Sequence, residues 1–158
     1  MVAGADFAGS IAGAGVRGEF LFSIKPNEPG SGFTKWIAGT DYQFARWLYA
    51  LVEYHFNGEG TKDRAKYDFE RLERGEILNV NRSYLFTMLS LQVHPLAKAG
   101  FSMISNLLDK SGLYSLSLDI SLKENLDITP GAQITYGDFM DEYRYYPSIY
   151  YLKAVYYF

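Results

Sequence analysis

The chain has 158 residues, enough for one domain with a sizeable core or for a small closed barrel. Its formal net charge is −3 and it has no block of like charge, which argues against a general nucleic-acid-binding protein. Cysteine is absent, so disulfides and thiolate metal sites are excluded, and the 2 histidines leave little material for a metal cluster. The composition therefore predicts no metal and no other cofactor.

No run of about 18 apolar residues occurs, so the sequence encodes no transmembrane helix. The first residues, MVAGADFAGS, lack the basic and apolar regions of a signal peptide, so an exported protein would be represented here by a mature form or an excised piece. Aromatic residues are frequent, with 14 Tyr, 11 Phe and 2 Trp. Hydropathy alone classifies the chain as soluble, but membrane-spanning strands hide their apolar face in alternation.

Polar and apolar residues alternate through almost the whole chain, which predicts β-strands. In LYSLSLDISL, for example, Leu116, Leu118 and Ile120 face one way and Ser117 and Asp119 the other. Nine strands are predicted, at residues 5–11, 16–24, 35–44, 47–56, 83–93, 98–107, 113–122, 126–136 and 149–158. Most have about ten residues, the length with which a tilted strand crosses a bilayer.

Short and long connections alternate between these strands. The short ones are AGAG, AR, HPLAK and KEN, and the longer ones are KPNEPGSGFT, residues 57–82, LDKSG and GDFMDEYRYYPS. Short turns at one end of the sheet and longer loops at the other are typical of outer-membrane β-barrels.

A short helix is predicted at 62–74, inside the long loop at 57–82. Thr61 caps it, Glu70 and Arg74 form an i,i+4 pair, and Gly75 ends it. Its apolar residues, Ala65, Phe69 and Leu72, are expected to pack on the rim of the barrel.

Three features indicate which face of the strands is inside. The polar faces are rich in Ser, Thr, Asn and Gln and poor in the Lys and Glu that coat soluble strands. Aromatic residues lie mainly towards strand ends, where membrane barrels carry interfacial girdles. The last residue is Phe158, with Tyr156, Ala154 and Leu152 on its face of the strand. These features favour a polar lumen over a soluble sandwich or lipocalin-like barrel, whose apolar face lies inside.

The C-terminal residues YLKAVYYF resemble the last strand of Gram-negative outer-membrane β-barrels, which ends in Phe with an aromatic residue two positions earlier. The segments GADFAGSIAGAGVRGEFLF, AGTDYQF, LYALVEYHFNGEG and HPLAKAGFSMISNLLDKSG look like hairpins in the C-terminal part of porin-like members of this family. The resemblance implies an antiparallel up-and-down transmembrane β-barrel in a bacterial outer membrane and passive passage of solutes. It also implies that the barrel-assembly machinery reads Leu152, Ala154, Tyr156 and Phe158.

The odd number of strands is a difficulty. Strands one and nine of an up-and-down sheet run the same way, whereas bacterial barrels have an even number and close antiparallel. Two arrangements remain: residues 1–12 form an arm beside an eight-stranded barrel, or the other strands lie on missing sequence or another chain. We favour the second, and in either case expect residues 1–158 to form a single domain. An eight-stranded barrel would be filled by side chains.

The polar faces supply ten candidate lumen residues: Arg17, Glu19, Asp41, Gln43, Glu53, His55, Asp119, Asp127, Gln133 and Lys153. One interpretation is a charged wall that selects solutes by sign, and the other is a ladder of cross-strand ion pairs that only neutralise one another. A catalytic site would need His55 near Asp41 or Ser90. No spacing supports that, so we predict that the chain is not an enzyme.

Other motifs have structural interpretations. GAGVRGE leads into a strand where a phosphate-binding loop would open a helix. Pro130, followed by Gly131, predicts a β-bulge. The segment DFMDEYRYYPS is expected to be an exposed loop, with cation or ligand binding as the alternative. Alternative functions are a structural or adhesion barrel that binds partners through loops 57–82 and 137–148, and a soluble lipocalin-like ligand binder.

Overall fold

The computed structural model describes residues 1–24 and 32–158. The described residues form nine strands: β1 (Val2–Ile11), β2 (Ala14–Ser23), β3 (Phe33–Ala45), β4 (Leu48–Asn57), β5 (Ser83–His94), β6 (Ala97–Asn106), β7 (Gly112–Lys123), β8 (Leu126–Tyr136) and β9 (Ile149–Tyr156). The predicted strands are therefore confirmed, with ends that differ by a few residues. Most of the predicted connection KPNEPGSGFT, at residues 25–31, lies outside the described residues.

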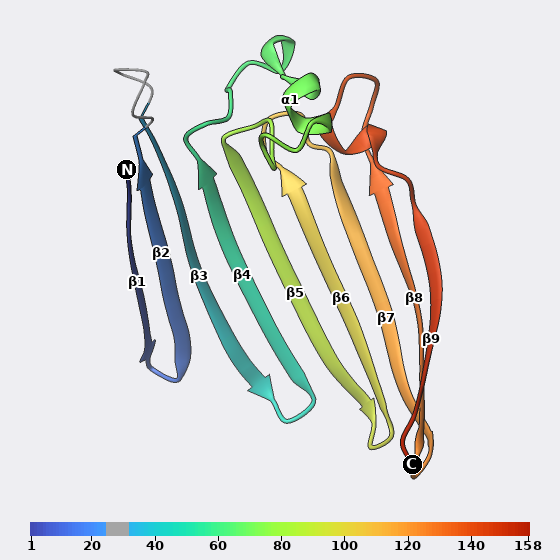
Figure 1. Cartoon of the computed structure of the whole chain (residues 1–158). Coiled ribbons are helices and arrows are strands. Elements are labelled where there is room, and N and C mark those ends of the chain that lie inside the picture. The colour runs from blue at the N-terminus through green and yellow to red at the C-terminus, as the bar shows by residue number, and fades with distance from the viewer. Residues whose placement is uncertain (25–31) are drawn as a thin grey trace.

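The strands form one sheet in which every strand is hydrogen-bonded to its neighbours in the sequence, in the order β1 to β9, and every pair is antiparallel (Figure 1). The all-β, up-and-down prediction is thus confirmed. Within the described residues the sheet is open, because β1 and β9 pair on one side only. The short turns lie at one end, which we call the turn end, and the longer connections lie at the other, the loop end.

Strand alternation gives the sheet two chemically different faces. The registers place Arg17 opposite Gly39, and Gly39 opposite Glu53, so these residues share one face, which we call the polar face. Trp36, Phe20 and Phe56 lie opposite one another on the other face, the apolar face.

Aromatic side chains gather on the apolar face at both ends of the sheet. At the loop end, the ring of Trp36 lies 5.1 Å from that of Tyr54 and 5.6 Å from that of Phe56. Tyr114 and Tyr136 stack there at 4.6 Å, and at the turn end Tyr42 and Phe44 meet at 5.0 Å. The face between these two groups carries aliphatic side chains such as Leu89, Leu116 and Ala132, together with Phe101.

This apolar face is uncovered. Leu116 in the middle of β7 is 44% exposed and Leu152 on β9 is 70% exposed. Among the described residues, the buried hydrophobic side chains are Ile77, Val80, Tyr84 and Tyr143, all near the loop end. The sheet therefore has no layer of its own packed against its apolar face in the described part of the chain.

The predicted bulge at Pro130 is wrong. The pairs Ser117–Gly131 and Ile120–Ile128 keep one register across it, and Pro130 itself pairs with Leu152 on β9. Proline lacks only its backbone N–H donor, so the hydrogen bonding between β8 and β7 is interrupted near Pro130 without an inserted residue. Irregularities occur instead beside the short turns, at residues 43/45, 92/94 and 121/123.

The predicted helix at 62–74 is broken into a 3-10 turn, η1 (Arg64–Lys66), and α1 (Phe69–Glu73). Asp63 and Asp68, and not Thr61, cap the two pieces, and each cap starts a new turn after extended or irregular backbone. The Glu70–Arg74 pair at 3.5 Å and the end at Gly75, with φ +70°, agree with the prediction. No helix in the described residues is long and apolar enough to cross a membrane.

Candidate functional site

The registers put all ten candidate lumen residues on the polar face. The strand pairs that fix this include Arg17–Gly39, Glu19–Ile37, Asp41–Leu51, Gln43–Tyr49, Gly39–Glu53, Ile37–His55, Lys98–Asp119, Ser121–Asp127, Ser115–Gln133 and Thr129–Lys153. The small side chains of Ser102, Ser115 and Ser117 lie between the charged groups on this face.

Arg17 joins two of the predicted carboxylates. Its Nε donates to Glu53 Oε1 at 2.7 Å and its Nη1 to Asp41 Oδ1 at 3.1 Å. Gly15 and Gly39 leave the space that these side chains occupy, since a Cβ on either would lie 2.5 Å from Asp41 or Glu53. This part of the face is a cross-strand ion-pair ladder. Glu19 is not in it and instead lies opposite Asp6 of β1.

A second group of polar side chains lies at the turn end. Thr129 donates to Asp119 at 2.7 Å, and the Tyr157 hydroxyl donates to Asp127 at 3.3 Å. Together with Lys98 and Lys153 they line a hollow of about 240 Å³. Within the described residues neither lysine forms an ion pair.

Fewer polar contacts surround the other three candidates, Gln43, Gln133 and His55. The Gln43 amide donates to Leu48 O at 3.1 Å across its own turn, so its role there is structural. Gln133 lies opposite Ile149. His55 lies opposite Ile37 and stacks on Tyr84 at 5.9 Å, so the sheet does not bring it to Asp41 or Ser90.

The loop end carries a buried hydrogen-bond network that the sequence did not predict. Glu142, in η2 (Glu142–Tyr145), is 1% exposed. Its Oε1 accepts from Val80 N at 3.1 Å, and its Oε2 accepts from Tyr84 Oη at 2.6 Å and Asn106 Nδ2 at 2.8 Å. Asn81 Nδ2 donates to Asn106 Oδ1 at 2.6 Å, which ties the chain before β5 to the end of β6.

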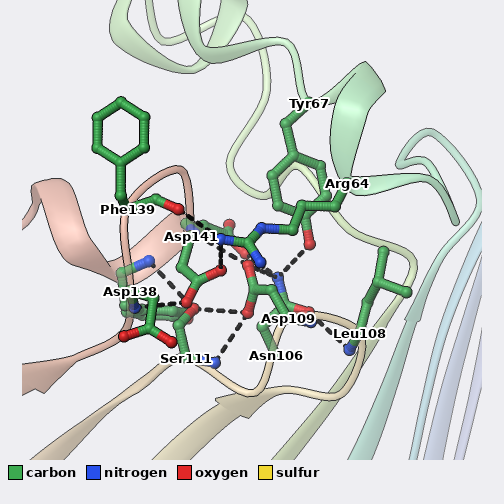
Figure 2. A network of polar contacts seen from close by, with 11 residues as sticks. Arg64, Tyr67, Asn106, Leu108, Asp109, Ser111, Asp138, Phe139 and Asp141 are labelled. Atoms are coloured by element: carbon green, nitrogen blue, oxygen red, sulfur yellow. Dashed lines mark hydrogen bonds and ion pairs between the residues drawn. The ribbon is translucent and has the colours of Figure 1, made fainter.

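Asp109 and Asp141 extend this network (Figure 2). Asp109 Oδ1 accepts from Ser111 Oγ at 2.7 Å, and Oδ2 accepts from Asn106 Nδ2 at 3.1 Å and Glu142 N at 3.0 Å. Asp141 Oδ1 pairs with Arg64 Nη2 at 2.7 Å. Arg64 also donates to the carbonyl of Phe139, so η1 is attached to the connection between β8 and β9.

An ion-pair chain attaches the long connection to β3. Lys35 Nζ lies 2.9 Å from Glu59, and Arg71 Nη2 lies 3.1 Å from the same carboxylate. Burial alone would raise the pKa of Glu59, but the hydrogen bonds and charges of Lys35 and Arg71 hold that pKa below its usual value. We call residues 58–82 and 137–148 together the cap.

The expectation of an exposed loop at 137–148 is wrong at its centre, because Asp141, Glu142 and Tyr143 are buried. Phe69 also departs from prediction: it contacts Tyr145 of the cap at 5.1 Å instead of a barrel rim, and Ala65 is exposed. The available sequence signal is asparagine at the last position of both β4 and β6, Asn57 and Asn106. Buried amides at equivalent strand ends indicate a polar network there.

The C-terminal residues divide between the faces as alternation predicts. Leu152, Ala154 and Tyr156 lie on the apolar face, opposite Pro130, Ile128 and Leu126, and Phe158 follows the end of β9. Tyr157 turns to the polar face, where it reaches Asp127.

Within residues 1–24 and 32–158, no group of three or more His, Asp or Glu side chains is placed to hold a metal ion. Comparison of the chain with protein-family models, curated proteins and solved structures gave no match.

Proposed function

We propose that this chain forms part of the wall of a transmembrane β-barrel in a bacterial outer membrane, and that its polar face lines a channel for passive passage of solutes. The observation that carries the proposal is the pair of faces: long strands with an uncovered apolar face, edged by aromatic rings, and charges on the other. An exposed apolar surface of this extent is unfavourable in water and suits hydrocarbon.

The polar face has the chemistry of a water-filled lumen. On β1–β4 this face carries one guanidinium, that of Arg17, and four carboxylates: Asp6, Glu19, Asp41 and Glu53. Lys35 also lies there and is paired with Glu59 of the cap. Charge of one sign along a pore wall favours ions of the opposite sign, so this part of the wall favours cations.

Closure of the barrel requires further strands. β1 pairs with β2 at every position from Val2 to Ile11, which argues against a detached arm beside an eight-stranded barrel. Since β1 and β9 run the same way, antiparallel closure needs an odd number of added strands, supplied by other polypeptide. The open outer edges of β1 and β9 are the surfaces on which these strands would pair.

The same proposal includes recognition of the last strand by the barrel-assembly machinery. Leu152 and Tyr156 project from the uncovered apolar face, and the outer edge of β9 is free within the described residues. An exposed edge with alternate aromatic and aliphatic side chains is suited to strand addition.

Ion conductance tests the proposal. The purified protein, reconstituted in planar bilayers with the strands that complete its barrel, should give discrete conductance steps, and under a salt gradient Glu19→Lys should move the reversal potential towards anions. Thr87→Val, on the apolar face opposite Val52, is the matched control and should leave the reversal potential unchanged. Completed barrels that stay electrically silent at every protein concentration, or a Glu19→Lys variant with unaltered selectivity, would contradict the channel.

A further inference from the structure

One side chain contacts both segments of the cap and the sheet. The Glu142 carboxylate, from the second segment, accepts hydrogen bonds from Val80 of the first segment, from Tyr84 of β5 and from Asn106 of β6. Tyr84 and Asn106 lie on the polar face, so the cap is attached on that side of the sheet at the loop end. In a channel, this is the side of the lumen.

No positively charged group in the described part of the chain lies where it would neutralise the Glu142 carboxylate. Within the described residues no cation lies within ion-pair distance of Glu142, and the guanidinium of Arg64 in the cap pairs with Asp141 instead. The other titratable groups that face it are the Asp109 carboxylate, which shares the Asn106 amide, and the hydroxyls of four tyrosines: Tyr67, Tyr84, Tyr143 and Tyr146. A buried carboxylate without a counterion is stable when it carries a proton and costly when it is ionised.

We propose that Glu142 is a pH-dependent fastener of the cap, which holds the cap closed over the channel mouth while the carboxyl is neutral and releases it when the carboxyl ionises. Closure over a channel mouth rests on the proposed function, whereas the fastener itself rests only on the Glu142 contacts. A neutral carboxyl still accepts hydrogen bonds from Val80 N and from Tyr84 Oη, the second at 2.6 Å. An ionised Glu142 carboxylate faces the Asp109 carboxylate in a buried site. Opening of the cap lets water solvate both carboxylates.

The direction of the pH effect follows from burial, which raises the pKa of Glu142 above its ordinary value despite the hydrogen bonds from Tyr84, Val80 and Asn106. The closed cap binds the proton more tightly than the open cap. Closure is therefore independent of pH below the ordinary glutamate pKa and weakens as pH rises through the raised pKa. The ratio of closed to open cap falls by at most about tenfold per pH unit across that window.

The absence of cysteine allows a direct test. Spin labels on Glu70→Cys in α1 and Leu107→Cys after β6, both exposed positions, report the distance between cap and sheet by pulsed electron paramagnetic resonance in detergent micelles. At pH 4 we expect one short distance. A longer population should grow as pH rises to 9.

Glu142→Gln, which cannot ionise, should show the short distance at every pH, and Glu73→Gln, an exposed cap carboxylate, should titrate like the unmodified chain. Distances in the labelled parent chain that do not change from pH 4 to 9 would overturn the fastener, and so would a pH response that Glu142→Gln leaves intact. A chain that conducts while its cap is insensitive to pH refutes only this inference. A cap that titrates in a completed barrel that does not conduct refutes only the channel.

Discussion

At the scale of single residues, the polar face is organised by space as much as by charge. Alternation places Arg17, Asp41 and Glu53 on one face, but their contact depends on the missing side chains of Gly15 and Gly39. The ion pairs are partly exposed, so each contributes modestly to stability.

Arg17→Met should lower the free energy of unfolding by about 1 kcal/mol, because it leaves two carboxylates facing each other without their shared cation. Urea unfolding followed by tryptophan fluorescence measures this. Lys153→Met is the control, since Lys153 has no ion pair within the described residues, and it should have little effect. Equal losses from the two variants would show that the ladder does not stabilise the sheet.

Asn106 is fully buried and bonds to Asn81, Tyr67, Asp109 and Glu142. Asn106→Ala should cost about 2–4 kcal/mol of unfolding free energy, because several buried polar groups lose their partner.

The control for this prediction is Gln133→Ala, on the same face, which should cost less than about 0.5 kcal/mol in the same urea experiment. If both variants unfold at the same urea concentration, the buried network is not what anchors the cap.

At the scale of elements, the strands were predictable because their signal is local: ten or so residues of alternation contain it. The burial of the cap was not predictable, because it comes from contacts between residues far apart in the chain. Glu142 meets Val80 and Tyr84 at separations of 62 and 58 residues. The helix at 62–74 failed for a local reason, since Asp63 and Asp68 each cap a separate turn.

The first cap segment depends on a glycine. A Cβ on Gly60 would lie 2.1 Å from Asn81 O, so Gly60→Ala must push this segment away from the chain that leads into β5. We expect trypsin to cut at Lys62 several-fold faster in this variant, as measured by mass spectrometry of limited digests. Gly9→Ala on β1, whose Cβ would meet only a Val16 methyl at 3.9 Å, should digest like the unmodified chain. An unchanged rate for Gly60→Ala would mean that the segment is not held there.

At the scale of the whole molecule, the sheet has two open edges and one uncovered apolar face. A soluble protein would cover such a face with a second layer, and none is present in the described part of the chain. A lipid-facing wall completed by further strands accounts for the edges and the face together.

The most direct test of this account is which solvent each face of β7 meets. Single cysteines at Leu116 and Ser117, adjacent on β7 but on opposite faces, can be labelled with an environment-sensitive fluorophore in lipid vesicles. Nitroxide-labelled lipids should quench the label at 116, and a water-soluble quencher should reach the label at 117. A label at 116 that lipid nitroxides do not quench would contradict a membrane-spanning wall. It would mean that the apolar face packs against protein instead of lipid.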